Sequence, residues 1–468
     1  MSPRHAPALV GFALAGWQLA GLSLAMLLPS LGTSIANTAL PTLAESFGAS
    51  FQDMQWVVLA YLLAMTTLVV SAGRLGDRVG RRRLLLIGIA TFTAASALCA
   101  VASDLWVLVA ARAAQGVGAA IMMALATAIA GDVVPRHRIG SAMGLLGTMS
   151  AVGTAMGPSL GGILIAVVGW RGIFAILVPL GALATVICAM VLPAQPGVPG
   201  ERKPFDVTGA LLLACALSAY AMGVTLGRGT FGTVNLALLL AAAAAFALFA
   251  LSQAKGGSPL IQPGALKDPA LRAGLIATAL VSTVMMTTLV VGPFFLSRSL
   301  SLPPLQVGLI LSVGPVLAAL TGLPGGLLVD RFGSRPVALG GLTGVASGSL
   351  ALAWLAPSMG VWGYTVAIGT MTTGYALFQA ANTAAIMGGV IASRRGVVSG
   401  LLGLARNLGL ITGASVMGAI FAAVSGGIDS PAPAIADATG VTFLVAALLS
   451  ALAIAATLDR AKLPIAEG

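Results

Sequence analysis

Charged side chains are scarce in this chain of 468 residues. Only 8% of the residues are Asp, Glu, Lys or Arg, whereas 58% are hydrophobic. Soluble domains carry roughly a quarter charged residues. A chain of this composition cannot cover its apolar surface in water, so we expect it to fold in a lipid bilayer.

Cysteine and histidine are also rare, which removes most metal-site and disulfide arrangements. Cys99, Cys188 and Cys215 lie inside apolar runs without the spacing of a metal site or a disulfide framework, and we expect them to be packing residues. His5 and His137 have no partner pattern. With no triad spacing, metal cluster or phosphate-binding loop, the sequence predicts neither an enzyme nor a cofactor.

Apolar runs long enough to cross about 30 Å of hydrocarbon recur along the chain. There are fourteen, centred near residues 28, 64, 92, 120, 154, 181, 217, 241, 285, 315, 345, 372, 410 and 447. We therefore expect an all-α polytopic membrane protein with 14 transmembrane helices. The apolar segment after the basic first residues lacks a clear cleavage site, so it predicts a first transmembrane helix and not a removable signal.

Lys and Arg gather in alternate loops, and this bias marks the cytoplasmic side of a membrane protein. Those loops contain Arg78, Arg81 to Arg83, Arg136, Arg138, Arg202, Lys203, Lys255 to Arg272, Arg331, Arg335, Arg394 and Arg395. The other loops contain only Arg171, Arg228 and Arg298. The pattern predicts both termini in the cytoplasm, and it makes the net charge of +11 a topology signal and not a sign of nucleic-acid binding.

Two pairs of matching motifs indicate a duplication. The Gly-Asp-Arg pattern of residues 73–82 recurs 253 residues later, in residues 326–335, and the glycine pattern of residues 140–157 recurs 256 residues later. These spacings predict two six-helix bundles, in residues 1–193 and 273–468, joined by residues 194–272. The joining segment would hold a cytoplasmic linker and two extra transmembrane helices. Repeats related by an axis along the membrane normal are typical of alternating-access transporters.

These motifs resemble the major facilitator superfamily, and within it the fourteen-helix drug:proton antiporter family. The resemblance covers nearly the whole chain and implies a major facilitator fold, a monomer in a prokaryotic cytoplasmic (inner) membrane, and the proton gradient as the energy source. It also implies that the two basic loops form a cytoplasmic gate. The gate residues would be Gly73, Asp77, Arg78, Gly80, Arg81, Gly326, Asp330 and Arg331.

Two further strings carry the resemblance. Arg112, followed by Gln115 and Gly116, resembles a signature whose buried arginine is implicated in proton coupling. An arginine inside an apolar span is costly unless it faces a cavity or a partner. Asp132 remains a second group that could carry the proton. The most specific string resembles the antiporter motif of the fifth helix and consists of Gly153, Gly157, Pro158, Gly161 and Gly162.

The chain departs from the family pattern in the first helix. Exporters of this family often carry an aspartate before an Asn-x-Ala-Leu-Pro string, and here Gly32 takes its place before Asn37. No acidic residue falls at the expected bilayer midplane, whereas Arg112 and Arg406 are expected to be embedded. Such a cavity disfavours permanent cations, so we expect a neutral, zwitterionic or anionic amphipathic substrate.

Candidate cavity residues are the polar side chains of the central helices. They are Asn37, Tyr61, Gln115, Gln379, Asn382 and Arg406. For each amide, a hydrogen bond between helices is an equally good interpretation.

The sequence thus predicts proton-driven efflux of hydrophobic or amphipathic small molecules such as antibiotics or toxic metabolites. The partners would be the substrate, protons and the lipid bilayer, with no nucleic acid. An uncoupled or symporting carrier for an organic anion is the alternative. A receptor or scaffold that transports nothing is the third class, and the two intact gate motifs argue against it.

Overall fold

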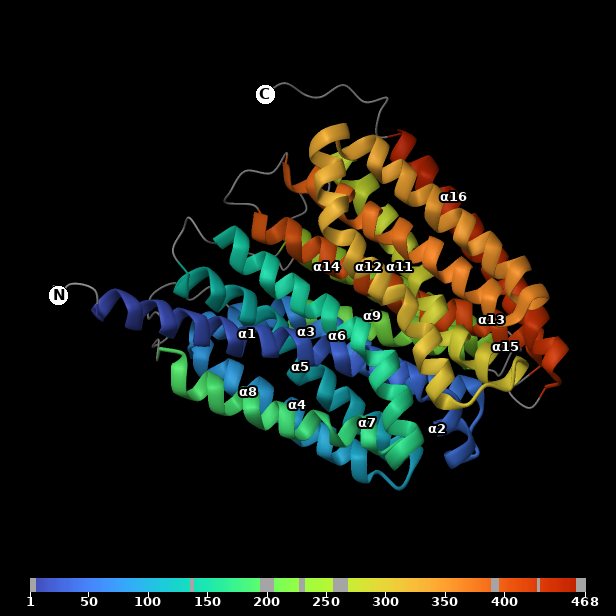
Figure 1. The fold of residues 1–468 in the computed structure, drawn as a ribbon, viewed down its shortest axis with the longest axis horizontal. Coiled ribbons are helices and arrows are strands. Elements are labelled where there is room, and N and C mark those ends of the chain that lie inside the picture. Colours follow the sequence, from blue (N-terminus) through green and yellow to red (C-terminus); the bar gives the residue numbers. More distant parts are fainter. Residues whose placement is uncertain are drawn as a thin grey trace.

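The computed structural model describes residues 6–134, 139–193, 206–226, 232–255, 268–388, 395–426 and 430–459. Every regular element in these ranges is helical (Figure 1). Helices satisfy all their backbone hydrogen bonds internally, which a bilayer demands of an apolar chain. Twelve of the described helices are long and apolar enough to cross a membrane.

The helix count agrees with the sequence once two helices are considered more closely. Helix α13, Ser334–Gly388, consists of two helices that meet at Gly360, where φ is 57° and ψ is −130°. Helix α3, Phe51–Val79, is not among the twelve, although its 29 residues are enough to cross. With α13 counted as two and α3 added, the described ranges contain the 14 crossing helices that the sequence predicts.

The N-terminal half contains eight helical segments. They are α1 (Ala6–Thr38), α2 (Leu40–Phe47), α3, α4 (Arg81–Val101), α5 (Leu105–Val133), α6 (Ile139–Val168), α7 (Gly172–Ala175) and α8 (Leu177–Val191). Helix α1 packs against α6, α5 and α8, and both α3 and α4 pack against α5. We call the two ends of the bundle the Phe51 end and the Val79 end, after the first and last residues of α3.

The C-terminal half repeats this construction. It contains α11 (Pro269–Phe294), η3 (Phe295–Ser299), α12 (Pro304–Phe332), α13, α14 (Arg395–Thr412), η5 (Gly413–Met417), α15 (Gly418–Ser425) and α16 (Ala432–Asp459). Helices α12 and α16 pack on α13, and α11 packs on α14 and α16. The segments η3 and η5 are π-helical turns at the Phe51 end.

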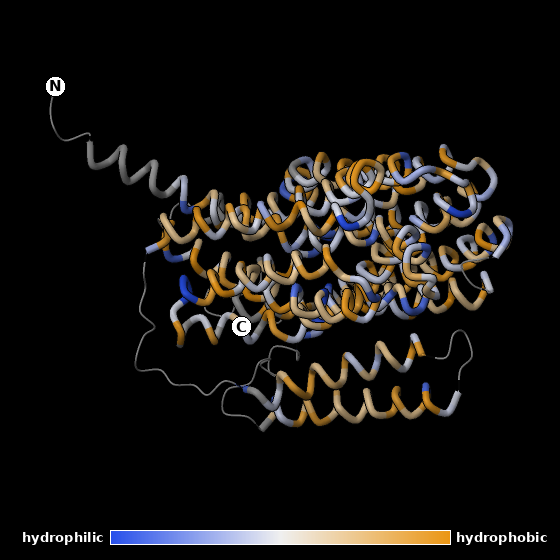
Figure 2. The backbone as a smooth tube through the Cα atoms, turned by 90° about the horizontal axis from the view of Figure 1, so that it is seen from below, coloured by the Kyte–Doolittle hydropathy of each residue, from blue (hydrophilic) through white to orange (hydrophobic). Residues whose placement is uncertain are grey.

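The two extra helices form a hairpin at the edge of the molecule, and the residues along them are mostly hydrophobic (Figure 2). They are α9 (Val207–Thr225) and α10 (Thr233–Lys255). The Asn235 amide donates to the Gly223 carbonyl at 2.9 Å and ties the two helices together. Helix α9 also packs against α3 and η5. Cys99 and Cys188 are buried and Cys215 on α9 is exposed, so the expected packing role agrees with the burial of the first two and not with that of Cys215.

The sequence repeat is also a repeat of packing contacts. Ser34 on α1 donates to the Gly153 carbonyl on α6 at 3.2 Å, and Thr283 on α11 donates to the Gly409 carbonyl on α14 at 3.1 Å. A methyl group at Gly153 or Gly409 would overlap backbone atoms of α1 or α11 respectively. The same glycines therefore let the first helix of each half approach its fifth.

The basic loops also share one turn. Gly80 between α3 and α4 has a φ of 99°, and Gly333 between α12 and α13 has a φ of 83°. Residues with side chains rarely adopt this conformation. The two copies of the loop motif therefore need glycine at the same place.

Candidate functional site

Arg112 forms the polar centre of the N-terminal half. Its side chain is completely buried on α5. The Nε atom donates to the Val57 carbonyl on α3 at 2.9 Å, and Nη1 donates to the Gly32 carbonyl on α1 at 3.1 Å. Nη1 also donates to Oε1 of Gln115 at 2.5 Å. The guanidinium thus joins three helices.

Aromatic rings complete the surroundings of this cation. The Arg112 guanidinium carbon lies 4.2 Å from the centroid of the Tyr61 ring and 5.9 Å from that of Phe174. Ring faces attract cations, most strongly where water is excluded. No carboxylate pairs with Arg112 among the described side chains, and its Nη2 atom has no hydrogen-bond partner there. Carbonyl oxygens and ring faces therefore surround this charge.

Three of the predicted cavity residues are engaged in hydrogen bonds between helices. Tyr61 donates its hydroxyl to the Pro29 carbonyl at 2.8 Å, and Gln115 donates to Ser96 Oγ at 2.7 Å. Asn382 on α13 donates to the Gly274 carbonyl at 3.1 Å and to Thr278 Oγ1 at 2.9 Å, both on α11. These contacts agree with the interhelical interpretation.

The other three keep polar atoms free. Asn37 is buried and donates to the Thr33 carbonyl at 3.1 Å, but its Oδ1 atom has no partner. Gln379 and Arg406 are half-buried, and neither has a hydrogen bond or ion pair to another described residue. The amide of Gln379 and the cation of Arg406 are therefore partly accessible to a ligand, whereas the unpartnered Asn37 oxygen is buried.

The antiporter motif is divided between two neighbours. A methyl group at Gly157 would overlap Ser34 on α1, and one at Gly161 would lie 3.2 Å from Ile35, also on α1. At Gly162 it would lie 2.7 Å from the Pro304 carbonyl and 3.0 Å from the Gly308 Cα atom, both on α12. One face of the motif therefore packs α6 against α1 of its own half, and the adjacent face packs it against α12 of the other half.

The halves meet at the Phe51 end. The Phe51 ring lies 4.8 Å from that of Phe294 and 5.2 Å from that of Phe421. Arg298 pairs with Glu45 at 3.0 Å across the same junction. The sequence motifs do not include these residues. A signal is nevertheless present, because Arg298 follows Glu45 by the same spacing that separates Asp330 from Asp77.

Among the residues that the structure describes, the glycines of the Val79 end have no neighbour in the other half. A methyl group at any of five positions on α3, α6, α12 and α14 would meet no described atom within 4 Å. These are Gly73, Gly147, Gly322, Gly326 and Gly403. Figure 1 shows the halves side by side, with α2 and α15 toward the Phe51 end. The described glycines that do meet the other half, Gly162, Gly308 and Gly418, lie at that end.

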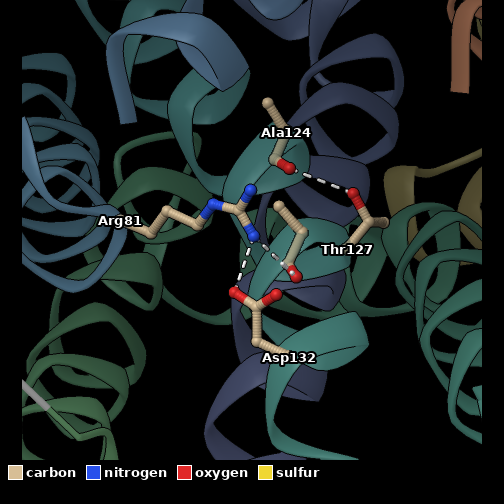
Figure 3. Close-up of polar contacts among 5 residues, drawn as sticks. Arg81, Ala124, Thr127 and Asp132 are labelled. Carbon is tan, nitrogen blue, oxygen red and sulfur yellow. Dashed lines mark hydrogen bonds and ion pairs between the residues drawn. The ribbon is translucent and has the colours of Figure 1, made fainter. Parts of the chain in front are cut away.

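The predicted gate residues lie at the Val79 end. Arg81 at the start of α4 pairs with Asp132 near the end of α5 at 2.6 Å and also donates to the Ala128 carbonyl at 3.4 Å (Figure 3). Asp330 and Arg331 in the second copy are exposed, and the Arg331 guanidinium lies 5.2 Å from the Phe332 ring. The side chains of Asp77 and Arg78 lie outside the described part of the chain.

The chain matches the family model of the Major Facilitator Superfamily over residues 22–260 and 274–465. It is 29% identical to the riboflavin transporter RibZ of Clostridioides difficile over 86% of this chain and 87% of the relative. It is 31% identical to the multidrug resistance protein Stp of Mycobacterium tuberculosis over 86% of this chain and 75% of that one.

Other similarities agree with these. The tetracenomycin C resistance and export protein of Streptomyces glaucescens is 27% identical over 88% of this chain and 76% of its own length. The crystal structure of a bacterial homologue of the human lysosomal transporter Spinster, described as inward-facing and unoccupied, superposes with a TM-score of 0.67. It covers 96% of this chain and 98% of that chain at 18% identity, which supports the likeness of fold alone.

Proposed function

Because the chain belongs to the Major Facilitator Superfamily, we propose that it exports hydrophobic or amphipathic small molecules by alternating access. Membership of this superfamily makes it a multi-pass membrane transporter and not an enzyme. The proton gradient across a bacterial cytoplasmic membrane would drive the export. The observation that carries the proposal is the position of the antiporter motif. Gly162 lies where the two halves of the molecule meet, so motion at this motif opens or closes a path between them.

The distribution of Lys and Arg in the sequence supports a cytoplasmic position of the Val79 end. With that orientation, the ring contacts, the ion pair and the glycine contacts between the halves at the Phe51 end support an inward-facing state. Substrate would enter between the halves from the cytoplasm and leave after the Phe51 end separates. The multidrug resistance protein and the tetracenomycin C export protein among the relatives support this direction.

Of the two proton-coupling candidates, Asp132 carries the proton in this proposal. Protonation of its carboxylate would weaken the ion pair with Arg81 and loosen α5 from α4 at the cytoplasmic end. Arg112 has a different part, because carbonyls and rings fix it in place. It holds α1, α3 and α5 as one unit during the motion.

The preferred substrate would be neutral, zwitterionic or anionic. Arg406 is a half-buried cation without an ion pair among the described residues, and Asn37 has a free acceptor. An anionic group would form an ion pair with Arg406, whereas the same side chain would repel a permanent cation.

Export is tested in a bacterial host that lacks its own drug exporters. Cells that carry the protein are loaded with anionic, neutral or cationic amphiphiles, and accumulation is compared with empty-vector cells. We expect lower accumulation of neutral and anionic compounds, restored by a protonophore. Exclusion of cationic dyes alone would contradict the substrate assignment.

An organic-anion carrier without proton coupling is the second candidate. It is favoured by the absence of a carboxylate beside Arg112 in the described structure, because the family's usual acid is replaced by Gly32. The direction of net flux under an imposed pH gradient separates the two. An antiporter moves substrate against the inward flow of protons, whereas an uncoupled carrier follows the substrate gradient alone.

A further inference from the structure

Two interfaces close the Phe51 end, and they are equivalent in the sequence repeat. In the first, Pro158 and Gly162 on α6 meet Gly308 on α12. The residues at the repeat spacing of the glycine motif are Ala414 and Gly418, on η5 and α15. The residue related to Gly308 by the spacing of the loop motifs is Gln55 on α3.

The first interface is a contact between backbones. A methyl group at Gly308 would overlap the Pro158 carbonyl and would lie 2.9 Å from the Gly162 Cα atom. No side chain separates the two helices at this point. The interface closes by shape alone.

The second interface has the same backbone positions but a different chemistry. Gln55 is only 2% exposed, and its Nε2 atom donates to the Ala414 carbonyl at 2.7 Å. The amide occupies the space that a side chain at position 418 would take, because a methyl group on Gly418 would overlap Nε2. A hydrogen bond thus replaces the direct backbone contact.

The residues packed around the hydrogen bond between Gln55 and Ala414 help it to keep the Phe51 end closed. The Phe51 ring, one turn before Gln55, packs against Phe294 and Phe421 and would lie 3.2 Å from a methyl group on Gly418. Because Gln55 is only 2% exposed, water does not compete for its amide. Helix α9 packs on the same interface, and Tyr220 bonds Thr412 Oγ1 at 3.1 Å, one residue before η5. The Gln55 Oε1 atom is buried without a partner among the described residues, and its desolvation offsets part of the stabilisation from the hydrogen bond. A modest net stabilisation suits a contact that must break in every transport cycle.

We propose that Gln55 is a positioning residue of the outer gate, whose hydrogen bond to Ala414 in the space left by Gly418 holds α3 against η5 in the inward-facing state. The inference rests on the proposed function, since it assigns the Phe51 end to the outside. The hydrogen bond of Gln55 makes the second interface chemically different from the first. Gln55 can be altered without touching the backbone fit of α6 on α12.

The test measures the gate itself, by pulsed electron paramagnetic resonance on the full-length protein in lipid nanodiscs. Spin labels are placed at Ser46→Cys and Ala432→Cys, exposed positions in opposite halves at the Phe51 end. The three native cysteines are replaced by alanine. Gln55→Met keeps the volume of the side chain but has no donor. We expect it to raise the ratio of long to short label distances about fivefold, as loss of a typical hydrogen bond implies.

Two further variants separate the hydrogen bond from general damage. Gln52→Met, one turn away on the same helix, is the matched control and leaves the ratio unchanged. Gly418→Ala fills the space of the Gln55 amide and shifts the distances as Gln55→Met does. In the double variant Gln55→Ala with Gly418→Ala, the added methyl group causes no further shift, because the amide it would displace is gone.

An unchanged ratio in both Gln55→Met and Gly418→Ala overturns the inference, as does an equal shift in Gln52→Met. These distances need no substrate, so they are independent of the export assay. Shifted distances without transport would contradict the proposed function and support the role of Gln55. Transport with unshifted distances would support the proposed function and contradict the role of Gln55.

Discussion

At the scale of single residues, the main feature is a buried cation without a carboxylate. Arg112 makes three hydrogen bonds to α1, α3 and its own helix and lies over the Tyr61 ring. The sequence predicts that Arg112 is embedded, because it lies within an apolar run. Its partners could not be predicted, since backbone carbonyls carry no sequence signature and Val57 and Gly32 are far away along the chain.

Arg112→Ala is expected to destabilise the protein by at least about 2 kcal/mol, because it leaves several buried acceptors without a donor and opens a cavity. The measurement is the thermal unfolding temperature in detergent. Arg406→Ala is the matched control and should change it little, as Arg406 makes no hydrogen bond to a described residue. Equal unfolding temperatures for the two variants would mean that the contacts of Arg112 do not support the bundle.

Gly32→Asp restores the acid of the family pattern. The first side-chain atom at this position would lie 3.2 Å from the Phe92 ring. Overpacking should therefore lower the free energy of unfolding of the variant by about 1–3 kcal/mol. The new carboxylate would also offset the charge of Arg112, and we expect relatively faster transport of cationic amphiphiles. Gly32→Ala has the same steric contact without the charge. If both variants show the same substrate preference, position 32 does not set it.

At the scale of helices, glycine positions decide which elements approach one another. The repeated glycines predict close packing of the fifth helix in each half, and the contacts of Gly153 and Gly409 agree. The sequence also predicts the crossing helices, because their apolar runs are long. It does not predict the π-helical turns η3 and η5, since a local change of helix pitch leaves the apolar run unbroken.

Gly157→Ala is expected to destabilise the protein by about 1–3 kcal/mol, because the methyl group would overlap Ser34 and push α1 from α6. The control is Gly147→Ala on the same helix, where nothing lies within 4 Å. It should change the unfolding free energy by less than about 0.5 kcal/mol. Denaturation in mixed micelles measures both, and a larger loss at position 147 would contradict the described contacts of α6.

At the scale of the whole molecule, two similar halves meet at one end. The repeat in the sequence predicts the halves, and the Lys and Arg bias predicts their orientation. Neither could predict which end is closed, because a transporter must be able to close both. The Arg298 and Glu45 pair and the Phe51 ring contacts answer that for this structure.

Closure of the Phe51 end predicts a pattern of chemical access. A cysteine introduced at Gly403, which meets nothing within 4 Å, should react with a membrane-impermeant thiol reagent applied from the cytoplasmic side. A cysteine at Thr38, which is 4% exposed, should react slowly from either side. Inside-out and right-side-out membrane vesicles provide the two directions. Fast labelling of position 403 from the periplasmic side alone would reverse the proposed orientation.

We propose that this transporter exchanges protons for neutral or anionic amphiphiles. The most direct test is the pH inside proteoliposomes that contain the purified protein, followed with a trapped dye after a pH gradient is imposed. The account predicts that adding such a compound speeds the decay of the gradient, and that permanent cations do not. Transport of the same compounds with no change in the pH decay would contradict proton coupling and leave an uncoupled carrier.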